Sequence, residues 1–197
     1  MQVMLGLTGA SGAPYAARVL RALVDAGADV GVVASRAGRQ VIALECYGDR
    51  EMDPAGTLER LVADHGGSTA KVWAESDYSA PYASGSAHTD AVIVCPCSMA
   101  SVGSIASGIE SNLIHRAAAV QLKEGRRLVL VPRETPLSEI HLENLLRLKR
   151  AGAAVVPAMP GFYRLPETIA DLVDFVAGRV LAAAGLDAAL VKPWGSA

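Results

Sequence analysis

Two short segments rich in glycine, serine and alanine carry the residue types that bind anions. The first, TGASG at residues 8–12, lies between an apolar run at 3–7 and the start of a helix-period pattern near Pro14. A strand, glycine turn and helix in this order aim free backbone N–H groups and the positive end of the helix dipole at an anion. Ser11 adds a hydroxyl donor. The spacing is not that of a GxGxxG dinucleotide motif, so a plain tight turn and an anion site both stay open here.

The second segment, CPCSMAS at residues 95–101, follows the apolar run 91–95 and places Ser98 and Ser101 at the start of another predicted helix. Ser35 follows the apolar run 30–34 in the same way. Ligands of open parallel sheets bind beyond the carboxyl ends of the strands. The sequence therefore predicts a ligand site at this edge of the sheet.

Four cations are candidates for holding anionic groups. Arg116 and Lys123 are seven residues apart on one predicted helix, 112–123, and so share a face. Arg133 follows the buried strand 127–131 and precedes Pro136, and Arg179 lies at the edge of the apolar face of the last helix. For a single arginine, a surface ion pair worth under about 1 kcal/mol is the better explanation. Arg133 is different, because its position between a buried strand and two prolines favours a functional role. Together, these cations exceed what one phosphate needs and indicate two anionic groups in one pocket.

Two carboxylates and a phenol could serve as acid, base or hydrogen-bond donor. Glu45 lies in the last turn of the predicted helix 36–46, where an acid opposes the helix dipole, and Glu134 is beside Arg133. Tyr163, in the loop 157–166, could close a pocket through its hydroxyl. The alternative for the two carboxylates is a structural salt bridge to a neighbouring arginine. The alternative for Tyr163 is a structural tyrosine buried in the loop. Cys97 at a helix start has no local partner base that would make it a nucleophile.

Alternating apolar runs and helix-period segments position these residues. Apolar runs at 3–7, 30–35, 91–95, 127–131 and 155–156 read as buried strands, with a weaker one at 72–73. Helical patterns separate them, and Asn112 is placed to cap one of these helices. This alternation predicts an α/β fold with three layers, Rossmann-like, around a parallel sheet. We expect a single domain over 1–197, with residues 185–197 as a C-terminal arm.

Composition narrows the class of protein. The 197 residues carry a net charge of −2, which does not favour nucleic acid or an anionic membrane as a partner. Hydrophobic residues make up 51% of the chain, which suggests surface buried between copies of it. The three cysteines and four histidines have no metal-ligand spacing, so we expect no metal and no disulfide framework. With no signal peptide or membrane-length apolar run, we expect a cytoplasmic protein.

The chain resembles the UbiX family of flavin prenyltransferases over nearly its whole length. The matching blocks, in the family's order, are TGASGAPY, CPCS, NLIHRAAAVQLKE, LVLVPRETPLSEIHLENLLRL, PGFYRLPETIADLVDFVAGRVL and a terminal PWG containing Trp194. The resemblance implies a dodecamer with its site at subunit junctions. It also implies that reduced FMN is a substrate, prenylated at N5 and then C6 by dimethylallyl phosphate without a metal. The prenylated FMN would pass to a UbiD-type decarboxylase, in ubiquinone biosynthesis or in aromatic-acid breakdown.

The resemblance also implies roles for individual residues. Ser11, Glu45 and Glu134 would act in catalysis, with Ser11 near the reacting N5 atom and Glu45 assisting proton transfer during ring closure. FMN would be held by Gly9, Ala10, Ser11, Ser35, Ser98, Met99, Ala100, Ser101 and Arg133. The prenyl phosphate would be surrounded by Arg116, Lys123, Glu134, Tyr163 and Arg179. This chain departs from the family in two places: Tyr78 stands where a tryptophan is common, and the 98–101 turn lacks the frequent lysine.

Two other classes of protein remain as alternatives. A flavin-dependent decarboxylase of a cysteinyl peptide or of phosphopantothenoylcysteine would have a similar fold, but it typically needs a histidine shortly after the second strand. The helix that follows Ser35 contains none. An FMN carrier, or the accessory subunit of an aromatic-acid decarboxylase, would bind the flavin without changing it. A mass measurement on the flavin after incubation with the prenyl donor separates a carrier from an enzyme.

Overall fold

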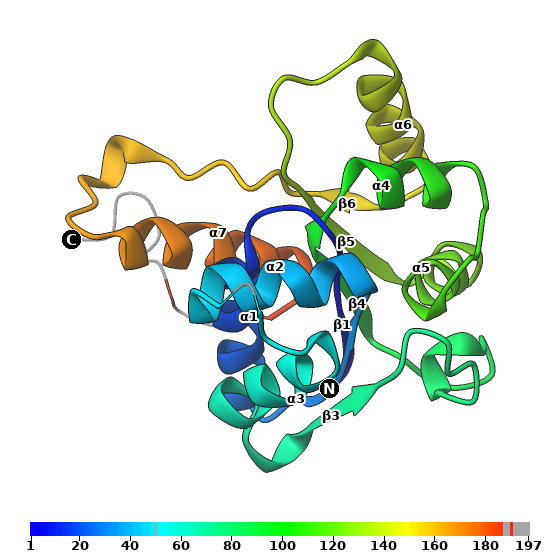
Figure 1. Ribbon diagram of the computed structural model, residues 1–197. Coiled ribbons are helices and arrows are strands. Elements are labelled where there is room, and N and C mark those ends of the chain that lie inside the picture. Colours follow the sequence, from blue (N-terminus) through cyan, green and yellow to red (C-terminus); the bar gives the residue numbers. More distant parts are fainter. Residues whose placement is uncertain (50, 187–189, 191–197) are drawn as a thin grey trace.

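The computed structural model describes residues 1–49, 51–186 and 190, and has a six-stranded parallel sheet at its centre (Figure 1). The strand order is β3-β2-β1-β4-β5-β6, and every neighbouring pair is parallel. The strands are β1 (Gln2–Leu7), β2 (Asp29–Ala34), β3 (Ala70–Trp73), β4 (Ala91–Cys97), β5 (Arg127–Pro132) and β6 (Ala154–Val155). The fold class predicted from the sequence is confirmed. Trp194 and most of the expected C-terminal arm lie outside the described residues.

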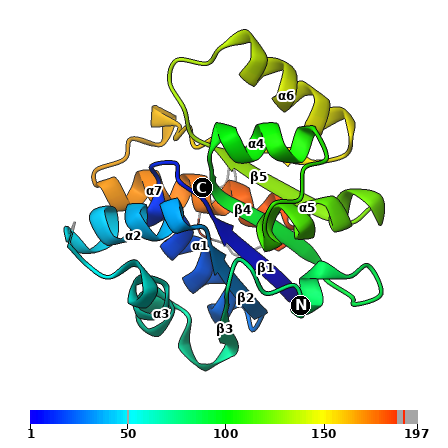
Figure 2. The same cartoon turned by 45° about the vertical axis from the view of Figure 1, so that its right-hand side comes forward.

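Helices cover both faces of the sheet. They are α1 (Ala13–Asp25), α2 (Arg36–Tyr47), α3 (Pro54–His65), α4 (Met99–Ala106), α5 (Leu113–Lys123), α6 (Glu139–Arg150) and α7 (Ile169–Ala183), with short 3-10 turns η1 (Gly67–Thr69), η2 (Pro81–Ala83) and η3 (Phe162–Arg164). Successive strand residues point to opposite faces, and the two hydrophobic cores follow this alternation. Leu5 of β1 packs in the core under α1, α3 and α7, whereas Met4 packs in the core under α4, α5 and α6. Therefore α5 and α7 lie on opposite faces of the sheet (Figure 2).

Most predicted elements appear within two or three residues of their expected ends. Asn112 caps α5 as predicted, its Oδ1 accepting from the His115 N–H at 2.9 Å. The predicted strand 91–95 instead continues to Cys97, because the Pro96 carbonyl accepts hydrogen bonds from the Thr8 N–H at 3.1 Å and the Thr8 hydroxyl at 2.9 Å. These bonds hold the end of β4 against the turn after β1. Among the described residues, no helix combines the length and apolar character needed to cross a membrane.

One apolar helix face is not buried within the chain. Leu142 and Leu146 of α6 are 53% and 49% exposed, and only Leu148 of this helix is buried. Figures 1 and 2 show α6 projecting beyond α4. Phe162 and Leu165, in the segment that leads from β6 to α7, are exposed as well. These side chains leave hydrophobic surface available for another copy of the chain.

Gly38, in the first turns of α2, permits the close approach of α2 to β1. A Cβ built on Gly38 would lie 2.5 Å from the carbonyl oxygen of Leu7, a backbone atom that cannot move aside. We expect Gly38→Ala to lower the free energy of unfolding by about 1–3 kcal/mol, because the methyl group overpacks the site. The matched control is Gly56→Ala in α3, where nothing lies within 4 Å of the added Cβ and the substitution should stabilise by about 1 kcal/mol. Urea unfolding of both variants tests this; equal stability of the two would contradict it.

Candidate active site at the carboxyl edge of the sheet

The side-chain carboxylate of Glu45 lies against the turn at residues 8–12, at the start of α1. The Oε2 atom of Glu45 accepts hydrogen bonds from the backbone N–H groups of Gly12 and Ala13, both at 2.8 Å. This explains why an acid is tolerated in the last turn of α2: it caps the N-terminus of α1 instead. The first N–H groups of α1 are therefore occupied. Gly9 and Ser11, which are exposed, form the part of the turn that faces outward.

Thr8 joins this turn to the second one. Its hydroxyl donates to the Pro96 carbonyl at 2.9 Å and accepts from the Ser98 N–H at 2.7 Å, and the residue is only 2% exposed. Ser98 caps α4, and its Oγ accepts from the Ser101 N–H at 3.3 Å. The two segments predicted to bind a ligand are thus hydrogen-bonded to each other. Nothing in the sequence pattern marked Thr8 for this role.

Ser35 and Arg133 complete this edge from the neighbouring strands. Ser35 caps α2 through its Oγ, which accepts from the Gly38 N–H at 3.1 Å, and its backbone N–H donates to the Leu7 carbonyl at 2.9 Å. The Nε atom of Arg133 donates to the Ser11 carbonyl at 3.1 Å. Glu134 follows, and its Oε1 accepts from the Thr135 N–H at 3.0 Å. The structure therefore brings together the predicted contacts on β1, β2, β4 and β5 within one chain.

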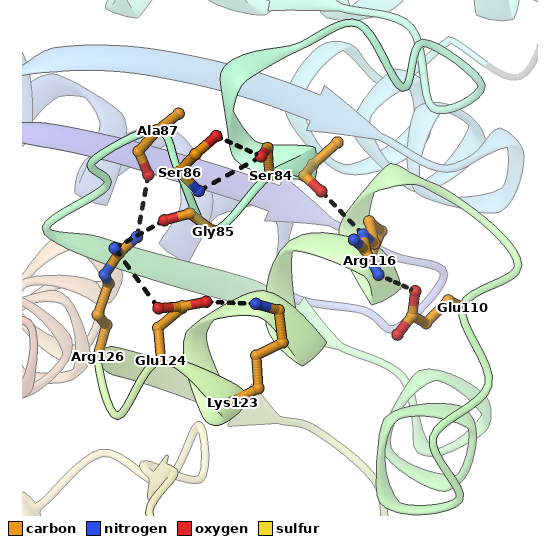
Figure 3. A network of polar contacts seen from close by, with 10 residues as sticks. Ser84, Gly85, Ser86, Ala87, Glu110, Arg116, Lys123, Glu124 and Arg126 are labelled. Carbon is orange, nitrogen blue, oxygen red and sulfur yellow. Dashed lines mark hydrogen bonds and ion pairs between the residues drawn. The ribbon is translucent and has the colours of Figure 1, made fainter.

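Arg116 and Lys123 project from α5 beside the loop at residues 83–87 (Figure 3). Arg116 donates from Nε to the Ala83 carbonyl at 2.8 Å and pairs with Glu110 at 2.7 Å. Lys123 pairs with Glu124, whose other carboxylate oxygen lies 3.9 Å from Arg126. Arg126 in turn donates to the carbonyls of Gly85 and Ala87 at 2.9 and 3.0 Å.

Arg179 and Tyr163 belong to the other face of the sheet. Arg179 is an exposed residue of α7 and lines a hollow of about 520 Å³ together with Val156, Met159 and Phe175. The ring of Tyr163 packs edge-to-face on Phe175, with centroids 5.8 Å apart. Since α5 and α7 cover opposite faces, a single chain does not gather Arg116, Lys123 and Arg179 into one cavity. A pocket that holds all four cations would therefore need residues from more than one copy of the chain.

The cysteine thiols are held in their neutral form. Burial raises the pKa of Cys97 to about 12, and burial together with the charge of Glu45 raises the pKa of Cys46 to about 11. A thiol with such a pKa is a poor nucleophile at neutral pH. In the described part of the chain, no three histidine, cysteine or acidic side chains gather as they would around a metal ion.

His115 is buried and hydrogen-bonded, although the sequence predicted only a surface or structural role for it. It is 6% exposed, yet both ring nitrogens have partners: Nε2 lies 3.2 Å from the Ser101 Oγ and Nδ1 lies 2.9 Å from the Ser111 Oγ. Burial lowers the pKa of His115, so the ring is neutral at physiological pH. A histidine inside an apolar helix pattern, three residues after a cap, was the only signal available in the sequence.

Comparison with known proteins places the chain among flavin enzymes. The Flavoprotein family model matches residues 1–181. Flavin prenyltransferase UbiX of Halalkalibacterium halodurans is 45% identical over 97% of this chain and 92% of the relative. Flavin prenyltransferase UbiX of Pseudomonas aeruginosa is 42% identical over 98% of this chain and 94% of its own length.

Solved structures agree with this placement. A dodecameric FMN-dependent UbiX-like decarboxylase from Escherichia coli O157:H7 superposes with a TM-score of 0.87 at 42% identity, over the full length of both chains. AnUbiX (PadA1), in complex with FMN and dimethylallyl pyrophosphate, has a TM-score of 0.86 at 40% identity and covers 100% of this chain and 98% of its own. The FMN-dependent cysteine decarboxylase TvaF, at 18% identity and a TM-score of 0.62, shares the fold alone.

Proposed function

The chain belongs to the UbiX family of flavin prenyltransferases, and on that premise we propose that it transfers a dimethylallyl group from dimethylallyl phosphate to N5 and C6 of reduced FMN. FMN is a substrate, and prenylated FMN and inorganic phosphate are the products. One observation carries the proposal. The Thr8 hydroxyl donates to the Pro96 carbonyl and accepts from the Ser98 N–H, and so joins the turn at 8–12 to the turn at 98–101. The two turns form one continuous polar edge, and Arg133 lies beside it because its Nε donates to the Ser11 carbonyl.

The residues of this edge would bind and orient the flavin. We assign FMN contacts to the outward part of the first turn, to Arg133 and to the start of α4: Gly9, Ala10, Ser11, Ser35, Ser98, Met99, Ala100, Ser101 and Arg133. Ser11 would lie near N5. Support comes from their common position after the carboxyl ends of adjacent strands.

The donor phosphate needs cations, because the carbon–oxygen bond breaks and the phosphate leaves with the electron pair. We assign this stabilisation to Arg116, Lys123, Tyr163 and Arg179, with Glu134 close by. The α5 and α7 residues lie on opposite faces of one chain. The proposed site is therefore assembled from neighbouring copies, in a homo-dodecamer like that of the Escherichia coli relative. The exposed apolar side chains of α6 and of the segment before α7 support such an assembly.

The proton balance of the reaction indicates the role that we propose for Glu45. Attachment at N5 releases one proton, and ring closure adds a proton to the allylic double bond and removes one from C6. We propose that Glu45, whose carboxylate reaches from α2 to the start of α1 beside the turn at 8–12, carries protons during ring closure. We further propose that the product passes to a UbiD-type decarboxylase in the cytoplasm, in ubiquinone biosynthesis or in aromatic-acid breakdown.

The activity is tested by mixing the purified protein with reduced FMN and dimethylallyl phosphate without oxygen. We expect release of phosphate and a flavin heavier by one five-carbon unit; dimethylallyl diphosphate in a parallel reaction shows which donor is used. Glu134→Gln should still fold and bind FMN, because the amide oxygen can accept from the Thr135 N–H as the carboxylate does. It should form no product, because the amide carries no charge. Bound FMN of unchanged mass with the wild-type protein would favour a flavin carrier. Loss of FMN from Glu134→Gln would contradict the placement of Glu134 at the prenyl donor.

A further inference from the structure

We propose that His115 is a positioning residue for the flavin: it fixes the direction of the hydrogen bonds that run inward from Ser98, so that the Ser98 hydroxyl offers FMN a lone pair and not a proton. The inference rests on the proposed function, because it takes the 98–101 turn as an FMN contact. His115 itself lies behind this turn, on α5, and acts through Ser101.

A single chain of hydrogen bonds connects the turn to the interior. The Ser98 Oγ donates to the Ser101 Oγ at 3.2 Å, and the Ser101 Oγ lies 3.2 Å from the His115 Nε2. On the other side of the ring, Nδ1 lies 2.9 Å from the Ser111 Oγ. Ser101 and His115 are 7% and 6% exposed, so solvent hardly competes for these bonds. The chain therefore links the starts of α4 and α5 through the imidazole.

The first bond, from Ser98 to Ser101, allows a direction to be assigned to the bonds that follow it. Because the Ser101 hydroxyl accepts from Ser98, its own proton is free to be donated to the His115 Nε2. We assign the Ser101 proton to Nε2, which makes Nε2 the unprotonated nitrogen of the neutral ring and leaves Nδ1 to donate its proton to the Ser111 Oγ. A charged imidazolium would instead donate to the Ser101 Oγ, and His115 would no longer accept the Ser101 proton. Burial of the ring lowers the pKa of His115 and so keeps it neutral.

These bond directions determine which hydrogen bond the Ser98 hydroxyl can still make with a ligand. Its proton is used inward, and one lone pair accepts from the Ser101 N–H at 3.3 Å. The remaining lone pair of this half-buried hydroxyl can only accept. Ser98 would thus select a hydrogen-bond donor, such as a hydroxyl of the ribityl chain, over an acceptor. Without His115, the Ser101 and Ser98 protons would be free to turn outward.

Three variants separate this role from a contribution to folding. His115→Leu removes both hydrogen bonds at similar side-chain volume, and His115→Gln restores an acceptor toward Ser101 through its amide oxygen. Gln121→Leu is the matched control, because Gln121 is a buried polar residue (1% exposed) on the same helix, and its side chain bonds only the Thr89 carbonyl among the described residues. Dissociation constants for FMN come from quenching of flavin fluorescence, and thermal unfolding reports stability.

We expect the FMN dissociation constant to rise about tenfold in His115→Leu, the effect of one lost hydrogen bond in a binding site. His115→Gln should recover most of the affinity, and Gln121→Leu should stay within about twofold of the wild type, since it removes no bond of this chain. Equal FMN affinity in His115→Leu and the wild type would overturn the proposal. So would an equal loss of affinity in Gln121→Leu. Wild-type protein that binds no FMN would overturn the proposed function as well.

The tautomer is measured separately, without any ligand. Nitrogen-15 NMR of the histidine ring in the wild-type protein should show a neutral ring with the proton on Nδ1 and an unprotonated, hydrogen-bonded Nε2. A proton on Nε2, or a charged ring at neutral pH, would overturn the inference even if the protein proves to be an active prenyltransferase.

Discussion

Arg179→Ala is expected to leave FMN bound while slowing prenyl transfer by about 10²–10³-fold, the range for loss of one donor that stabilises a developing anion. Arg179 lies on α7 and lines a hollow whose lining includes no residue of the turns at 8–12 and 98–101, so we expect the flavin contacts of its own chain to stay intact. The rate of phosphate release and the visible spectrum of bound flavin measure the two effects. Arg21→Ala is the matched control: it removes an exposed helical arginine, paired with Asp25, that has no assigned role.

Subunit mixing makes this prediction sharper. Lys123→Ala should be inactive for the same reason, but Lys123 lies on α5, on the opposite face of the sheet from Arg179. If the two cations of one site come from different copies, unfolding and refolding the inactive variants together should return activity. With equal amounts, about a quarter of the sites would contain both native side chains. No recovery in mixed assemblies, or loss of FMN from Arg179→Ala alone, would contradict the assignment.

The second large effect is expected at Glu45, where two functions can be separated. In Glu45→Gln the amide oxygen can still accept from the Gly12 and Ala13 N–H groups, but the side chain can no longer exchange a proton. We expect this variant to fold, bind FMN and release phosphate, while formation of the ring-closed product slows by about 10²–10⁴-fold, the usual contribution of a general acid–base. The absorption spectrum of the extracted flavin distinguishes the ring-closed product.

Glu45→Ala removes the cap as well. Two backbone N–H groups at the start of α1 lose their acceptor, which should lower the free energy of unfolding by about 1–2 kcal/mol and weaken FMN binding through the adjoining turn. Urea unfolding and a flavin titration measure this change. If Glu45→Gln forms the ring-closed product at the wild-type rate while Glu45→Ala does not, Glu45 acts only as a cap.

The fold could be predicted from the sequence because its signals are local. Continuous apolar runs, glycine-rich turns and caps such as Asn112 depend on neighbouring residues, and the strands and helices formed where these signals placed them. The edge of the sheet that holds Ser11, Ser35, Ser98 and Arg133 followed from the parallel strand order, which the alternation of elements implies.

Contacts between distant segments could not be predicted in the same way. Glu45 looked unfavourable at the end of α2, because the N–H groups that it caps are 32 and 33 residues away. Lys123 and Arg179 share no strand or helix, so spacing could not show that they lie on opposite faces. His115 was interpreted as surface or structural because the sequence shows no Ser-His-Asp or HExxH arrangement, and its partner Ser101 is 14 residues away on another helix.

The Thr8 hydroxyl has a consequence for the thermodynamics of ligand association. It ties the loops that follow β1 and β4 together by two hydrogen bonds, at 2.9 and 2.7 Å, from a position that solvent barely reaches. Both loops are therefore preorganised, and flavin need not supply the conformational entropy of ordering them. A larger share of its intrinsic interaction energy then remains available as net affinity.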